Sequence, residues 1–133
     1  MASLKAFLNP IKTENKNVII SDRFQEDGKP VPFTIRPVTQ EENNQMIKKY
    51  TRKDKKGNEE FDRVAYNMNL VTTAVVFPDL DNAELQNAYG TLGASKLLST
   101  MLYVGEFATL LEEVQKISGL DVEQEELVDE VKN

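Results

Sequence analysis

Residues 32–42 read PFTIRPVTQEE, and within this stretch the period of the side-chain pattern changes. Apolar Phe33 and Ile35 alternate with polar residues, and a period of two is typical of a half-buried strand. Thr39 is followed three residues later by Glu42, the spacing at which two side chains satisfy free backbone N–H groups at the start of a helix. The stretch therefore predicts a strand that passes directly into a capped helix.

The residues before this stretch predict the other strand of a β-hairpin over residues 17–38. Val18-Ile19-Ile20 is a short apolar run, and Asp27-Gly28 supplies the positive φ angles of a tight turn. Prolines have no N–H donor, so the second strand is expected at a sheet edge or in an interrupted ladder, given Pro30, Pro32 and Pro37.

An N-terminal arm over residues 1–16 precedes the hairpin. Its apolar residues have the spacing of one helical face: Leu4, Phe7, Leu8 and Ile11. This spacing would let the arm dock as a short amphipathic turn, but we expect it to be held loosely.

Two helices are predicted directly after the hairpin. The first extends from Thr39 to about Thr51, and a charged, exposed loop is expected over residues 52–58. The second starts near Glu59, has the strongest apolar periodicity of the chain, and is stopped by Pro78.

Three further helices follow, and glycines mark their ends. Asp81 and Glu84 form the capping box of the first of them. Gly90 then occupies the position where helices favour a left-handed residue. The remaining two helices are expected over about Ala94–Leu102 and between Gly105 and Gly119.

Together these elements predict an α+β fold that is mostly α: an N-terminal β-hairpin followed by about five helices in a small bundle. A length of 133 residues suits one compact domain, which we place at residues 17–120 as a single hairpin-plus-helical domain. Residues 121–133 are strongly acidic, and we expect them to form a disordered tail.

The composition argues against catalysis. The chain has no cysteine and no histidine, so it lacks disulfides, thiol nucleophiles, imidazole bases and the usual soft-metal ligands. No pair of carboxylates stands out as a desolvated acid and base. We therefore predict a protein that is not an enzyme and has no cofactor or metal.

No apolar run approaches the roughly 20 residues of a membrane span.

Charge is distributed unevenly along the chain. Residues 1–57 carry twelve Lys and Arg against seven Asp and Glu, a balance of +5, while residues 58–133 carry four against fifteen, a balance of −11. Such a split suits electrostatic steering or head-to-tail contacts, but solvated surface charge is the favoured explanation. The basic segment 48–56 offers a nucleic-acid hypothesis, through Lys48, Lys49, Arg52, Lys53, Lys55 and Lys56. The pI of about 4.8 argues against that hypothesis.

The C-terminal helices carry the densest apolar sequence. Most of these side chains must form the core, but a leucine-rich helix pair also suits a groove for a partner helix. The candidate partner-binding residues are Leu97, Leu98, Met101, Leu102 and Tyr103. For any single one of them, a core position is the favoured interpretation.

The order of these features resembles the XkdN-like tail assembly chaperones of siphophages, myophages and defective prophages of Gram-positive bacteria. The resemblance covers about Leu4 to Leu120. It follows the strand 33–37, then Tyr89-Gly90, Lys96-Leu97-Leu98, Met101-Leu102, Gly105-Glu106-Phe107, Leu110-Leu111 and Ile117-Ser118-Gly119.

This resemblance implies a non-enzymatic chaperone that binds the tape measure protein, the long helical ruler of the phage tail, and keeps it soluble during assembly. Such a protein would act in the cytoplasm of the bacterial host and would be absent from the mature virion. Self-association stays open. The alternative is a small phage-encoded regulator that binds nucleic acid through segment 48–56.

Overall fold

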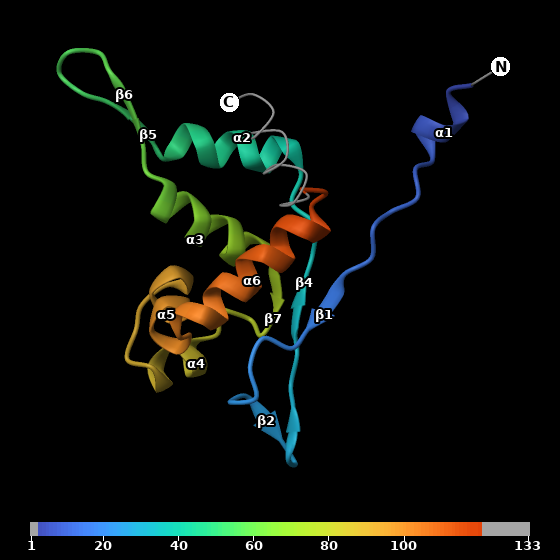
Figure 1. Ribbon diagram of the computed structural model, residues 1–133, viewed down its shortest axis with the longest axis vertical. Coiled ribbons are helices and arrows are strands. Elements are labelled where there is room, and N and C mark those ends of the chain that lie inside the picture. The colour runs from blue at the N-terminus through green and yellow to red at the C-terminus, as the bar shows by residue number, and fades with distance from the viewer. Residues whose placement is uncertain (1–2, 121–133) are drawn as a thin grey trace.

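The structure, a computed structural model, describes residues 3–120 and within them contains six helices and seven short strands (Figure 1). This mixture confirms the α+β class. In chain order the elements are α1 (Lys5–Leu8), β1 (Lys16–Val18), β2 (Gln25–Glu26), β3 (Lys29–Pro30), β4 (Phe33–Ile35), α2 (Gln40–Lys49), β5 (Thr51–Lys53), β6 (Glu59–Phe61), α3 (Arg63–Ala74), β7 (Val75–Phe77), α4 (Ala83–Ala88), α5 (Ala94–Met101) and α6 (Val104–Ile117). The acidic tail predicted at 121–133 lies outside the described residues.

The central sheet has three antiparallel strands in the order β1–β4–β7. β4 is therefore the middle strand, so the edge position is wrong, whereas the alternative of an interrupted ladder agrees with the register shift between Thr34 and Ile35 in the pairing with β7. Pro32 and Pro37 flank Phe33–Ile35, so every residue within β4 keeps its N–H donor. β7 was not predicted, and its presence makes the sheet larger than a hairpin.

The predicted turn at Asp27-Gly28 is present at the tip of the β2–β3 ribbon. Its φ angles are 53° at Asp27 and 77° at Gly28, and Glu26 lies opposite Lys29 across it. Figure 1 shows this ribbon projecting from one end of the sheet, while the N-terminal arm leaves from the other end.

The helix after β4 has the predicted cap. The Thr39 hydroxyl accepts a hydrogen bond from the Glu42 N–H at 3.2 Å, and the Glu42 carboxylate accepts one from the Thr39 N–H at 3.1 Å. Arg36 also donates two hydrogen bonds to that carboxylate, at 3.0 and 2.8 Å. The Arg36 pair is the main reason why the pKa of Glu42 falls to about 2.

The second predicted helix has different boundaries in the structure. It begins at Arg63 because Glu59–Phe61 pairs with Thr51–Lys53 as the β5–β6 hairpin, so the loop expected at 52–58 is mostly the end of that hairpin. It ends at Ala74, before Pro78, because the β-branched and aromatic run Val75–Phe77 joins the sheet as β7.

Two caps near the C-terminal helices also differ from the predictions. The N-cap of α4 is Asn82 and not Asp81, because the Asp81 N–H donates to Asp79 Oδ1 in a local turn and the Asn82 side chain accepts from Leu85. α6 begins at Val104, so Gly105 lies in its first turn.

The core lies between the sheet and the helices on one of its faces. Val18 and Phe33 are opposite each other in the register and both are buried. α3 contacts β7, α5 and α6, and α6 contacts β1, so these helices cover that face. The largest fully buried side chains are Ile35, Val71, Leu97, Leu98, Leu110 and Val114.

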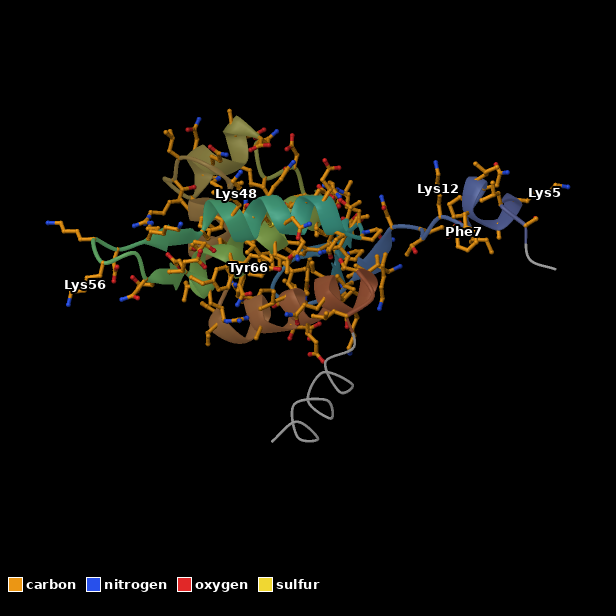
Figure 2. All side chains as sticks on the ribbon, turned by 90° about the horizontal axis from the view of Figure 1, so that it is seen from above. Lys5, Phe7, Lys12, Lys48, Lys56 and Tyr66 are labelled. Carbon is orange, nitrogen blue, oxygen red and sulfur yellow. The ribbon has the colours of Figure 1, made fainter. Side chains whose placement is uncertain are left out.

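Two segments project from this body. Figure 2 shows the arm with Lys5, Phe7 and Lys12 at one end of the molecule and the β5–β6 hairpin with Lys56 at the other. Each large apolar side chain of the arm between residues 4 and 11 is exposed. That the arm is loosely held stays a prediction.

Candidate partner-binding groove

An apolar groove lies where the β2–β3 ribbon, the end of β7, α4 and α5 come together. Its cavity volume is about 200 Å³. Nine residues line it, and none of them is charged: Phe24, Val31, Pro32, Phe33, Phe77, Pro78, Leu85, Tyr89 and Met101. A concave apolar surface of this kind suits the apolar face of a partner helix.

The groove continues into a second hollow of about 410 Å³ along α4. The two share Phe77, Pro78 and Leu85. The second hollow has a polar and acidic border that includes Asp79 and Glu84. The combined surface is therefore apolar at its centre and negatively charged along one side.

Short elements hold the walls of the groove in place. β7 is an edge strand, and Phe77 on it is 53% exposed. The amide of Gln86 fixes α4 to the neighbouring loops, since it donates to the Leu80 carbonyl at 2.8 Å and accepts from the Gly93 N–H at 3.0 Å.

An ion pair anchors the end of the groove at Phe24. Arg23 donates to both carboxylate oxygens of Glu106, at 2.9 and 2.5 Å, and to the Met101 carbonyl at 2.9 Å. Hydrogen bonding from Arg23 is the main reason why the pKa of Glu106 falls to about 2, against the opposing effect of burial. The guanidinium also stacks on Phe24 and Tyr103, at 5.0 and 3.9 Å from the ring centres.

The structure separates the five residues predicted to bind a partner. Leu97, Leu98 and Leu102 are buried in the core, so a partner cannot touch them in this conformation. Met101 is also nearly buried but forms part of the groove floor. Tyr103 is 66% exposed and borders the groove through its stack with Arg23. Partner binding by these residues stays a prediction, and the accessible surface lies beside most of them.

Most of the groove residues were missed by sequence reasoning. Phe24 and Tyr89 fall in or next to turns, and Phe77-Pro78 was interpreted only as the end of a helix. The available signal was the apolar run Val75–Phe77 immediately before a proline, which is also the pattern of an edge strand.

The basic segment 48–56 divides between the end of α2 and the β5–β6 hairpin. The register places Arg52 opposite Glu60 and Lys53 opposite Glu59, so acidic residues offset part of the positive charge. Asp54 accepts hydrogen bonds from the N–H groups of Lys56 and Asn58, which lower its pKa and shape the turn. This arrangement favours a stable hairpin and adds no support to the nucleic-acid hypothesis.

Residues 3–120 contain no group of three or more His, Cys, Asp or Glu side chains arranged to hold a metal ion. Over the same range, every helix is too short or too polar to cross a membrane.

Comparisons with known proteins agree with the resemblance seen in the sequence. Residues 4–132 match the family described as phage XkdN-like tail assembly chaperone protein. The phage-like element PBSX protein XkdN of Bacillus subtilis (strain 168) is 30% identical over 129 residues, which covers 92% of this chain and 87% of that protein. An uncharacterized protein of the same strain, YqbN, is 31% identical with the same coverage.

The fold has also been observed by crystallography. The crystal structure of a protein named YqbN superimposes with a TM-score of 0.77 at 26% sequence identity. The match covers 91% of this chain and 99% of that one.

Proposed function

The chain belongs to the XkdN-like family of phage tail assembly chaperones, and from this premise we propose that it binds the tape measure protein and keeps it soluble while the tail assembles. It would do so without catalysis, in the cytoplasm of the bacterial host, and would leave before the virion matures. The apolar groove is the single observation that carries this proposal.

The chemistry of the groove favours an amphipathic helix as the bound segment. A long helical ruler exposes apolar stripes until the tube encloses it, and such stripes aggregate unless another apolar surface covers them. The groove offers aromatic rings at the wall in Phe77 and Tyr89 and a flexible thioether at the floor in Met101. A flexible methionine adapts to differing partner sequences, and rigid aromatic rings supply apolar contact area at low entropic cost.

The Arg23–Glu106 pair supports the same proposal from the structural side. It joins the strand connection at residue 23 to the start of α6, and its stack with Tyr103 and Phe24 fixes one end of the groove. A preformed groove loses less conformational entropy on binding than one that must be assembled. The proposed partner-binding set is therefore Phe24, Phe77, Leu85, Tyr89, Met101 and Tyr103.

The test is co-expression with the tape measure protein of the same phage or prophage, followed by affinity purification. We expect the wild-type chain to recover soluble tape measure protein and Phe77→Asp to recover at least ~10-fold less, because a carboxylate would be desolvated at the centre of the interface. Val64→Asp is the matched control, since Val64 is 82% exposed on α3 and does not line the groove.

Circular dichroism on each variant shows whether it is folded. Equal recovery by wild type and folded Phe77→Asp would remove the groove from the interface. No recovery by wild type would contradict the proposed function itself.

A further inference from the structure

The N-terminal arm exposes more apolar surface than a folded chain normally leaves uncovered. Four large side chains within eight residues, Leu4, Phe7, Leu8 and Ile11, are between 71% and 99% exposed. Single exposed apolar residues are common, but a cluster on a projecting segment indicates a binding element. Figure 2 shows Phe7 well clear of the body of the molecule.

The spacing of these side chains is that of a helical anchor. Positions 4, 7, 8 and 11 fall on one face of a helix, and residues 5–8 already form the helical turn α1. α1 ends before Asn9-Pro10, because a proline cannot continue the helix, so Leu4, Phe7 and Leu8 form the helical apolar face and Ile11 follows outside the helix. The arm is thus a short segment with the same chemistry as an amphipathic helix that docks in a groove.

The groove described above complements the arm in charge as well as in apolarity. The arm carries Lys5 and Lys12, without an acidic residue between positions 1 and 13. The border of the groove carries Asp79 and Glu84. The arm therefore combines apolar side chains with positive charge, and the groove combines an apolar centre with a negative border, which is the complementarity that favours association.

The arm and the groove of one copy are poorly placed to meet. The arm leaves β1 at Lys16, which pairs with Ile35, whereas the groove lies at the opposite end of β4, where Phe33 lines it. β1 and β7 are also opposite edges of the sheet. To reach its own groove, the arm would have to reverse direction and cross the sheet.

We propose that, in the absence of a client protein, the arm of one copy of this chain docks in the Phe77–Leu85–Tyr89 groove of a second copy. The contact is heterologous, since it joins two different surfaces. In a dimer formed in this way, one copy still has a free groove and the other still has a free arm, so further copies can add at either end.

The arm–groove contact would also compete with the proposed client, the tape measure protein. An arm and a tape measure helix need the same groove, so binding of one excludes the other, and this part of the inference rests on the proposed function. The self-association does not, because it requires no client.

The test is sedimentation velocity of the full chain over a range of concentrations, without client. We expect the mass of the wild type to rise with concentration beyond one copy. Phe7→Asp/Leu8→Asp, which changes only exposed arm residues, and Phe77→Asp, which changes the groove, should each stay monomeric. The matched control Val64→Asp should behave as wild type.

Mixing the variants identifies the two surfaces. An equimolar mixture of the arm variant and the groove variant leaves one intact arm and one intact groove, so it should form a heterodimer and grow no further. Higher salt should weaken this heterodimer, because opposite charges flank the contact. Failure of the mixture to associate, or association of the arm variant alone, would overturn the proposal.

A peptide of residues 1–12 with a fluorescent label gives a second measurement that does not depend on the fold of Phe77→Asp. It should bind the arm variant with saturable anisotropy, and unlabelled peptide should compete. Absence of binding would contradict docking. If the peptide binds but the tape measure protein is not recovered in co-expression, the proposed function fails while this inference stands.

Discussion

The arm and α5 have similar apolar sequence patterns and opposite environments. Leu97, Leu98 and Met101 on α5 fall at helical spacing and are buried, whereas Leu4, Phe7 and Leu8 fall at helical spacing and are exposed. α5 packs against α3, while Figure 1 shows α1 apart from the other helices and strands of residues 3–120, and no residue of α1 is buried. Periodicity therefore predicts that a segment has an apolar face, but not what covers that face.

The largest expected effect is a difference in the free energy of unfolding between a variant in α5 and a variant in the arm. Leu98→Ala should lower the free energy of unfolding by about 3 kcal/mol, because it leaves a cavity in a fully buried site. Phe7→Ala should change it by less than about 0.5 kcal/mol, because the ring is exposed. Urea unfolding of both variants measures the difference. Similar losses would mean that the arm is part of the folded core.

An intermediate effect is expected where the core meets the groove. Glu106→Gln should cost about 2 kcal/mol, since it removes the charge that Arg23 pairs with at a largely buried site. The same urea experiment measures this loss. Lys116→Gln, which breaks an exposed pair with Glu112 on α6, should cost at most about 0.5 kcal/mol. Equal costs for the two variants would contradict a structural role for the Arg23 anchor.

A smaller effect appears as a dependence on pH. The pKa of both Glu42 and Glu106 is about 2 in the folded chain, against a usual 4.5, so folding favours their ionised forms. Their contribution to stability is therefore complete above about pH 4.5 and is lost as the pH falls toward 2. Thermal unfolding of wild type and Glu106→Gln between about pH 5 and pH 2.5 should show a shallower acid loss in the variant. Parallel curves would exclude Glu106 as a source of that loss.

Sequence reasoning found the elements with strong local signals. The Thr39–Glu42 capping box, the Asp27-Gly28 turn and the left-handed Gly90 are all present, because each depends on a few neighbouring residues. β7 and the β5–β6 hairpin were missed, because short strands depend on partners distant in the sequence or on a turn hidden among charges.

The candidate site was harder to predict for the same reason. Leu97 and Tyr103 lie close together in the sequence, yet one is in the core and the other is on the surface. The groove gathers Phe24, Phe77 and Tyr89 from three separate regions, and only the tertiary fold brings them together. Sequence alone located the apolar C-terminal helices near this groove but not the walls that make it accessible.

Site-specific photo-crosslinking tests most directly whether the groove receives the client. The chain would carry p-benzoylphenylalanine in place of Phe77 in one sample and in place of Val64 in another, each co-expressed with the tape measure protein. We predict a crosslink to the tape measure protein from position 77 and none from position 64. Crosslinking from position 64 with none from position 77 would contradict the account.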